Sequence, residues 1–303
     1  MKKRIYSPLI LLAAAAIWGF AFAAQDAAAS VPAFTLGAAR SLLATLFLLI
    51  LIPISDALTG SKRRLISRRG IDFTRGELVG GAICGVILAV ATAAQQLGIN
   101  SGTDGGKAAF ITALYVVLVP IYALAIKRRA TVNVWISVAI AVVGFYFLCI
   151  TDRLTVAPSD LYVVLCAVIF PFHILVIDRF SPSCNGLRMC CVQFAVSTLV
   201  NIAFAAVFEG AAGLPALSDA LPSVLYLGIC SSGIAYTLQI IGQRGTDPSL
   251  ATVILSLESV FGVIGTAVFL GQSLSPREYL GCAIVLVAVI LAQLEPKKHA
   301  KRE

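Results

Sequence analysis

The chain has 303 residues, of which 59% are hydrophobic and only 13% are charged. Soluble domains contain roughly 45–50% apolar and about 25% charged residues, so this composition indicates an integral membrane protein. No polar stretch longer than a loop separates the apolar runs, which excludes an extramembrane catalytic domain. The formal charge of +8 would suggest nucleic-acid binding in a soluble protein, but here we expect no nucleic-acid partner, because the distribution of charge over the loops matters more than its sum.

Apolar runs of about 20 residues, each long enough to cross about 30 Å of hydrocarbon as a helix, recur along the chain. Glycine, proline and polar residues separate them. The pattern predicts an all-α integral membrane protein with ten transmembrane helices, at residues 8–26, 34–54, 77–97, 106–126, 131–150, 160–178, 187–208, 220–242, 248–270 and 276–294.

The lysines and arginines test this division, since cytoplasmic loops carry an excess of them. With both termini in the cytoplasm, all but four of the 23 basic residues fall on the cytoplasmic side. The exceptions are Lys107, Arg153 and Arg277 in outer loops and Arg40 within the second helix. An odd number of helices would scramble this asymmetry. We therefore expect a multi-pass protein of the cell membrane with both termini cytoplasmic.

Two short motifs occur twice. Gly102-Thr103-Asp104 and Gly245-Thr246-Asp247 lie 143 residues apart, and Gln95-x-x-Gly98 matches Gln239-x-x-Gly242 at a spacing of 144. Five predicted helices separate equivalent points, and an odd number inverts the second copy relative to the first. The chain is predicted to consist of two inverted five-helix repeats, 1–150 and 151–303, the second ending in a short basic tail. Such repeats suit alternating access in secondary transporters.

The first residues, Met1-Lys2-Lys3-Arg4 followed by an apolar run and Ala21-Phe22-Ala23, have the pattern of a cleavable signal peptide. The repeat argues against cleavage, because the second half retains its own first helix. We expect the segment to remain as the first transmembrane helix.

Several local sequences are similar to those of a known family: Trp18-Gly19-Phe20, Arg40, residues 107–120, Leu257-Glu258-Ser259-Val260-Phe261 and Leu270-Gly271-Gln272. Over its whole length the chain resembles two repeats of the EamA family of the drug/metabolite transporter superfamily. The resemblance implies a ten-helix inverted-repeat carrier whose cavity is lined by helices 1, 3, 4, 6, 8 and 9 and which exports small metabolites or drugs. This chain departs from the family pattern at Gln272, where Glu is common, and at Ser259, where Pro is frequent.

Glu258 is the most conspicuous candidate site residue. It lies ten residues into the ninth predicted helix, about 15 Å from its start and close to the bilayer midplane. A charge there costs about 2.5–3.5 kcal/mol on insertion scales, which makes it a functional candidate. We expect Glu258 to contact substrate or a proton; the alternative is a structural hydrogen bond to another helix. Tyr115 occupies the corresponding position when the triplets are superposed.

Two basic residues are candidates for gating or charge contacts. Lys107 stands at the outer end of the fourth predicted helix, and Arg40 lies about two turns in from the outer end of the second. Either could bind an anion. Both side chains are long enough to extend to the membrane interface instead, which is the alternative.

The remaining candidates for substrate binding are polar or aromatic residues at membrane depth. A histidine after a helix-kinking proline could relay protons, and uncharged amides and hydroxyls could bind solute or join helices. Aromatic rings could form a cavity wall or simply pack. These residues are His173, Gln95, Gln239, Ser232, Trp18, Phe110 and Tyr236.

No nucleotide-binding motif, metal-ligand spacing or Ser/His/Asp constellation is present in the sequence. The eight cysteines lie mostly within apolar runs and are interpreted as packing residues. We therefore expect no metal, no cofactor and no ATP-driven step within this polypeptide, and coupling to a proton or another ion remains open.

The sequence predicts a secondary transporter, an exporter of small metabolites, amino acids or drugs, rather than an enzyme. One alternative is an importer or exchanger of an anionic metabolite, for which Arg40 and Lys107 would matter more than Glu258. A further alternative is a non-transporting membrane subunit; an intramembrane enzyme would have no use for the repeat. The expected partners are a small solute and the lipid bilayer, and a homodimer remains open.

Overall fold

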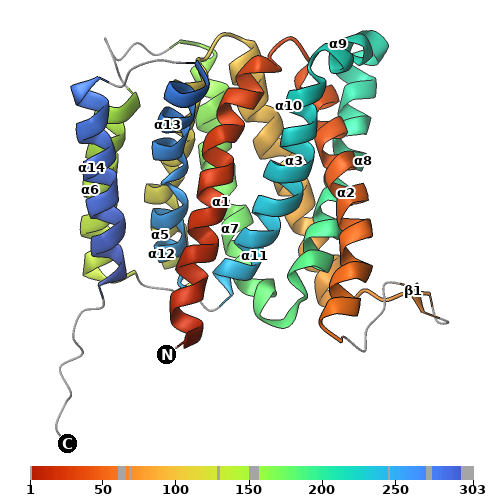
Figure 1. Cartoon of the computed structure of the whole chain (residues 1–303), viewed down its shortest axis with the longest axis horizontal. Helices are drawn as coiled ribbons and strands as arrows, with labels where there is room; N and C mark the ends of the chain where they lie inside the picture. Colours follow the sequence, from red (N-terminus) through yellow and green to blue (C-terminus); the bar gives the residue numbers. More distant parts are fainter. Residues whose placement is uncertain are drawn as a thin grey trace, which may run out of the picture.

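The protein is a bundle of long, roughly parallel and antiparallel helices in a computed structural model (Figure 1). The structure describes residues 2–60, 66–67, 70–127, 130–149, 157–244, 246–270 and 275–294. The first half contains α1 (Lys2–Ala27), α2 (Ala33–Leu58), the two-residue strands β1 (Ile66–Ser67) and β2 (Gly70–Ile71), α3 (Arg75–Asn100), α4 (Gly105–Ala113), α5 (Tyr115–Ala125) and α6 (Val132–Cys149).

The second half contains more short elements. They are α7 (Asp160–Phe180), the 3-10 turns η1 (Ser181–Ser183) and η2 (Gly210–Gly213), α8 (Gly186–Phe208), α9 (Leu214–Asp219), α10 (Leu221–Leu225), the π-helix η3 (Tyr226–Ala235), α11 (Tyr236–Gln243), α12 (Pro248–Leu255), α13 (Glu258–Leu270) and α14 (Pro276–Gln293).

Within the described residues, nine helical segments are long and apolar enough to cross a membrane, and a tenth apolar helix, Val132–Phe147, is shorter. A helix occupies each of the ten predicted ranges, but three of them are not continuous α-helices. The fourth is interrupted at Leu114, the eighth contains the π-helix η3, and the ninth is interrupted at Ser256 and Leu257. These departures all lie deep within apolar runs.

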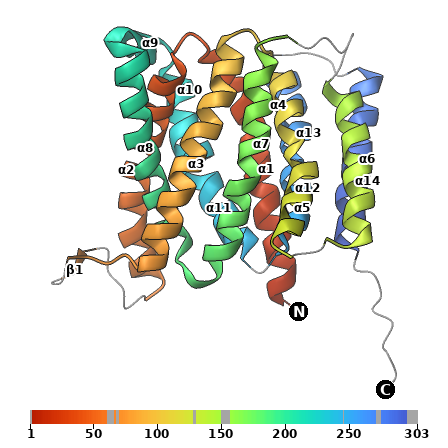
Figure 2. The same ribbon diagram turned by 180° about the vertical axis from the view of Figure 1, so that it is seen from behind.

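The helices alternate in direction, so that the start of α1 and the end of α14 both lie at the end drawn lowest in Figure 1. We call this the lower end and the opposite one the upper end. The α6–α14 pair forms one side of the bundle and the α2–α8 pair the other, as Figures 1 and 2 both show. Between them, α1 and α7 lie on opposite faces of the molecule.

The repeated triplets begin helices, because each aspartate side chain satisfies free backbone N–H groups at a helix start. Asp104 accepts hydrogen bonds from Gly106 N and Lys107 N at α4, with donor–acceptor distances of 2.9 and 3.2 Å. Asp247 accepts from Ser249 N and Leu250 N at α12, at 2.9 and 3.4 Å. Gly245, in the second triplet, lies outside the described residues.

Candidate functional site

A small cavity extends from the middle of the bundle toward the upper end. Its volume is about 30 Å³, room for about two water molecules, so the surrounding helices must separate before it can hold a metabolite. It is lined by Trp18, Ala21, Phe22, Gln25, Arg40, Thr92, Gln95, Thr112, Cys166, Phe170, Ser231, Tyr236 and Glu258.

Glu258 enters this cavity at a break in its membrane-spanning segment. At Leu257 and at Leu114 the backbone N–H bonds to the carbonyl three residues back instead of four, and a new helix begins at the next residue. Glu258 is therefore the first residue of α13, and Tyr115 is the first residue of α5. Interrupted helices at this depth are typical of solute sites in membrane carriers.

The two side chains at these breaks are neighbours, and both are buried. Even so, Glu258 Oε1 and Tyr115 Oη have no partner at hydrogen-bond geometry among the described residues. A buried polar atom without a partner is costly to keep. The arrangement places a carboxyl oxygen and a phenol oxygen side by side, without a partner at strict hydrogen-bond geometry among the described residues.

The backbone of α1 crosses α13 directly beside Glu258. A Cβ atom at Gly19 would lie 2.7 Å from both Glu258 O and Gly262 N, so only glycine permits this approach. One residue earlier, the Trp18 indole lines the cavity and donates to the Ser231 carbonyl oxygen at 3.2 Å. The Trp-Gly pair thus combines a cavity wall with a close helix contact.

Arg40 lines the cavity from α2 and is 7% exposed. Its Nε donates to Ser232 Oγ at 3.1 Å and its Nη2 to Ser231 Oγ at 3.2 Å. Both serines belong to the π-helix η3, and π-helical turns are frequent at functional sites. Among the described residues no carboxylate lies within ion-pair distance of Arg40, and the side-chain hydrogen bonds of its guanidinium go to the two neutral serine hydroxyl groups.

An amide network borders the upper part of the cavity. Gln25 Nε2 donates to Gln95 Oε1 at 2.9 Å and to Gln96 Oε1 at 3.2 Å. Gln95 Nε2 in turn donates to Thr112 Oγ1 at 2.8 Å. Both ends of the Gln95 amide are therefore hydrogen-bonded, and the network joins α1, α3 and α4.

Lys107 lies apart from the cavity. Its Nζ pairs with Asp160 Oδ2 at 2.5 Å, and Thr103 Oγ1 donates to the other carboxylate oxygen at 3.0 Å. The contact joins the start of α4 to the start of α7 at the upper end of the bundle. Lys107 thus makes an ion pair between the two halves of the chain.

The other sequence candidates lie outside the cavity lining. Ser232 lies directly behind the lining, in contact with Arg40, and Tyr115 lies directly behind it, in contact with Glu258. His173 and Gln239 are fully buried nearer the lower end, and Phe110 packs at the edge of the apolar core. The candidates that line the cavity are Trp18, Arg40, Gln95, Tyr236 and Glu258. Gln272 and the basic tail lie outside the described residues.

Several lining residues were missed by the sequence reasoning, notably Gln25 and Phe170. Gln25 could have been found, because it lies seven residues after Trp18 on one helical face. The lining residues three and four positions after Trp18 lie on that same face. Phe170 packs against both Trp18 and Tyr115, with ring centroids 6.4 and 5.5 Å away. Nothing in an apolar run distinguishes it from the other core aromatics.

Known proteins resemble this chain over nearly its whole length. An uncharacterized transporter of Archaeoglobus fulgidus is 29% identical over 294 residues, covering 96% of this chain and 87% of the relative. The uncharacterized inner membrane transporter YedA of Escherichia coli K12 is 24% identical over 302 residues, covering 97% and 93%. A crystal structure matches with a TM-score of 0.74 at 19% identity, covering 95% of this chain and 96% of that one, which shows a shared fold.

The model of the EamA-like transporter family matches residues 6–150 and again residues 157–294. The resemblance drawn from the sequence is thereby confirmed, and with the apolar helices it identifies a multi-pass membrane transporter. The chain belongs to the EamA-like transporter family.

Proposed function

We propose that this protein is a secondary transporter that exports small organic solutes across the cytoplasmic membrane by alternating access. The observation that carries the proposal is the cavity at mid-depth, which one buried carboxyl group, Glu258, and one buried guanidinium, Arg40, both line. Ionisable groups within a membrane bundle mark solute or proton pathways. Family membership supports transport, and the geometry supports the place where it occurs.

Alternating access fits two inverted repeats of five helices, and two pairs of features support them. The helix-starting aspartates Asp104 and Asp247 are separated by the same 143 residues as the breaks at Leu114 and Leu257. Tyr115 and Glu258 then correspond to each other, each at the start of the second half of a broken helix. This correspondence supports the proposed division of the chain into 1–150 and 151–303.

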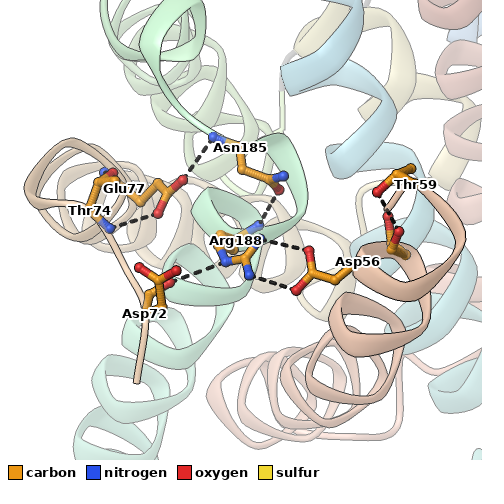
Figure 3. A network of polar contacts seen from close by, with 8 residues as sticks. Asp56, Thr59, Asp72, Thr74, Glu77, Asn185 and Arg188 are labelled. Atoms are coloured by element: carbon orange, nitrogen blue, oxygen red, sulfur yellow. Dashed lines mark hydrogen bonds and ion pairs between the residues drawn. The ribbon is translucent and has the colours of Figure 1, made fainter. Parts of the chain in front are cut away.

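The α2–α8 pair supplies the second pair of features. At the upper end, Glu209 after α8 accepts from Phe34 N and Thr35 N, at 2.8 and 2.7 Å, at the start of α2. At the lower end, Asp56 near the end of α2 binds Arg188, near the start of α8, through two hydrogen bonds of 3.1 and 2.7 Å (Figure 3).

Each carboxylate thus holds the start of the opposite helix. Asp56 and Glu209 are 153 residues apart, as are Thr35 and Arg188. This is the relation expected of a two-fold axis in the membrane plane.

The lower end is proposed to face the cytoplasm. The lower-end segments carry Arg75, Arg179, Arg188 and Arg244, in keeping with the excess of basic residues on cytoplasmic sides. The name of the Escherichia coli relative, an inner membrane transporter, is consistent with the cell membrane. Both termini are then cytoplasmic.

In the proposed cycle the two halves rock about the cavity and expose it to each side in turn. Glu258 binds a proton or a cationic group of the solute, with Tyr115 beside it. Arg40 binds an anionic group, and its bonds to Ser231 and Ser232 hold the guanidinium at the cavity wall. Trp18, Phe170 and Tyr236 form an aromatic wall on which the apolar part of the solute packs.

A second candidate function is uptake or exchange of an anionic metabolite. It is favoured by Arg40, a buried cation with no carboxylate in ion-pair range among the described residues. For an anionic solute, loss of the Arg40 charge abolishes binding while loss of the Glu258 charge does not.

The test has two stages. Purified protein is screened against amino acids, organic acids and organic cations for a rise in thermal stability, because a ligand that binds the folded state raises its apparent Tm. Flux of the stabilising solute is then measured in proteoliposomes for the wild type, for Glu258→Gln and, as a control, for Asp26→Asn at an exposed acidic position of α1.

We expect Glu258→Gln to lose most of the flux and Asp26→Asn to retain it. Equal flux in both variants removes Glu258 from the mechanism. A protein that binds and moves no solute alone, and becomes active only with a second chain, is instead a non-transporting subunit.

A further inference from the structure

Below the cavity, four fully buried polar side chains lie between α7, α8 and α11. They are His173, Gln193, Gln239 and Gln243, each at most 1% exposed, and we call them the polar seam. His173 Nε2 and Gln193 Oε1 are 3.0 Å apart, and Gln243 Nε2 donates to Ile174 O at 3.5 Å. The seam is otherwise poor in hydrogen bonds.

Each seam residue has a buried polar atom without a partner among the described residues. These atoms are His173 Nδ1, Gln193 Nε2, Gln243 Oε1 and both amide atoms of Gln239. Leaving such atoms unsatisfied in the interior costs stability, and native proteins do so rarely. Four adjacent side chains that share this property call for an explanation other than packing, because apolar residues of the same size would pack at lower cost.

The equivalent glutamine in the upper half of the molecule shows the opposite pattern. Gln95, which corresponds to Gln239 at the repeat spacing of 144 residues, has both ends of its amide hydrogen-bonded and lines the cavity. The two equivalent glutamines thus have different environments: Gln95 lines the cavity, whereas Gln239 is fully buried in the packed interior.

The seam also continues the cavity in a definite direction. On α11, Tyr236 lines the cavity, and Gln239 and Gln243 follow three and seven residues later, within one face of the helix. The step from Tyr236 to Gln243 is about 10 Å along the axis. The His173 ring packs against the Tyr236 ring with centroids 5.7 Å apart. Figure 1 shows α11 running to the lower end of the bundle.

We propose that the polar seam is the lower half of the transport pathway, closed in this structure, along which water and solute pass between the cavity and the lower end. When α11 separates from α7 and α8, the unpartnered amide and imidazole atoms become hydrated or bind the uncharged hydrogen-bonding groups of the solute. The proposal rests on the transport function above and adds a route and a second, neutral set of solute contacts.

Cysteine labelling tests the route without knowledge of the solute. Gln243→Cys and Gln239→Cys are made in a background whose native cysteines are replaced, and a membrane-impermeant maleimide is added to inside-out vesicles. Ile52→Cys on α2 is the control, since Ile52 is 1% exposed, as buried as Gln243, but apolar. We expect both seam positions to be labelled and the control position to remain unlabelled.

A second substitution distinguishes labelling through an open route from labelling through nonspecific local fluctuations of the helices. Gln239→Leu removes two polar atoms that lack partners only in the closed conformation. The substitution therefore favours the closed conformation by roughly tenfold, about 1.4 kcal/mol. We expect it to slow labelling at Gln243→Cys by about that factor and to raise Tm. Gln95→Leu, which breaks satisfied bonds, is the matched control and lowers Tm.

No labelling at either seam position, or labelling equal to that of the control, overturns the proposal. If the cysteine-free background does not fold, hydroxyl-radical footprinting of the unmodified chain replaces it. Corrected for intrinsic reactivity, His173 is then oxidised faster than Phe145, which is equally buried in α6, and equal rates overturn the proposal. A seam that is labelled in a protein that moves no solute contradicts the proposed function and leaves the route intact.

Discussion

The cavity is lined by one acidic and one basic side chain among the residues described, and they differ in how they are held. Arg40 is fixed by two serine hydroxyl groups on η3, whereas Glu258 has an oxygen without a partner. The fixed group is suited to orienting a solute. In the proposed cycle, Glu258 gains and loses a proton or a cationic group of the solute.

Arg40→Lys tests the orienting role. A lysine keeps the positive charge but cannot donate to Ser231 and Ser232 from one rigid plane. We expect the concentration for half-maximal flux to rise roughly tenfold, about 1.4 kcal/mol, with little change in Tm. Flux titrations in proteoliposomes measure this.

Arg244→Lys is the control for Arg40→Lys, because Arg244 donates to the carbonyl oxygens of Ser181 and Cys184 away from the cavity. An equal shift in both variants would show that Arg40 has no special role in solute binding.

At the scale of single residues, polarity within apolar runs was informative. It selected Glu258, Arg40 and Gln95 from the sequence, and all three line the cavity. It could not show that Lys107 pairs with Asp160, because that contact depends on how α4 and α7 pack. Nor could it show that Gln239 is unpartnered while Gln95 is fully bonded, since the sequence environments of the two glutamines are similar.

The elements that shape the site are irregular helices. The breaks at Leu114 and Ser256–Leu257 and the π-helix η3 bring Glu258 and Ser231 to the cavity wall and place Tyr115 and Ser232 directly behind it. The sequence predicted these segments as continuous helices, because no glycine or proline marks either break and π-helical bonding has no compositional signal. Hydrophobic length locates a membrane helix but does not specify its internal hydrogen bonding.

The α1–α13 crossing gives a prediction at this scale. Gly19→Ala places a Cβ 2.7 Å from backbone atoms of α13, which must move apart. Overpacking of this kind costs about 1–3 kcal/mol, so we expect a lower Tm and a displaced Glu258.

Gly262→Ala on the opposite side of the same crossing is the matched control for Gly19→Ala, because the nearest atom to its Cβ would be 3.5 Å away. Thermal unfolding and flux of both variants are measured together. A Gly262→Ala variant as damaged as Gly19→Ala would refute the crossing geometry.

The ion pair between α2 and α8 at the lower end gives another prediction at this scale. Arg188 is 1% exposed and pairs with Asp56, and removal of one partner of a buried ion pair costs about 3–5 kcal/mol. We expect Arg188→Met to lower stability strongly. Because the double variant with Asp56→Leu leaves no uncompensated charge, it should recover most of the loss in a denaturant titration. A double variant less stable than Arg188→Met would contradict the proposed pairing.

For the whole molecule, the proposed relation between the two halves is supported by the repeated triplets and by the paired helix starts, breaks and end contacts. The ten segments follow from hydrophobic length, and their common lower end agrees with the distribution of lysine and arginine. The conformation, with a small open space above and a closed seam below, could not have been predicted. The two halves contain similar short motifs, and only the packing of the folded chain decides which of them is closed.

The central claim is that one site at mid-depth is exposed alternately to the two sides of the membrane. Counterflow tests it most directly: proteoliposomes are preloaded with unlabelled solute from the stability screen, and uptake of a trace of labelled solute is followed. We predict a transient accumulation of label above equilibrium in the wild type, and its loss in Glu258→Gln. A wild-type protein that only equilibrates the label, or a Glu258→Gln variant with undiminished counterflow, would contradict the account.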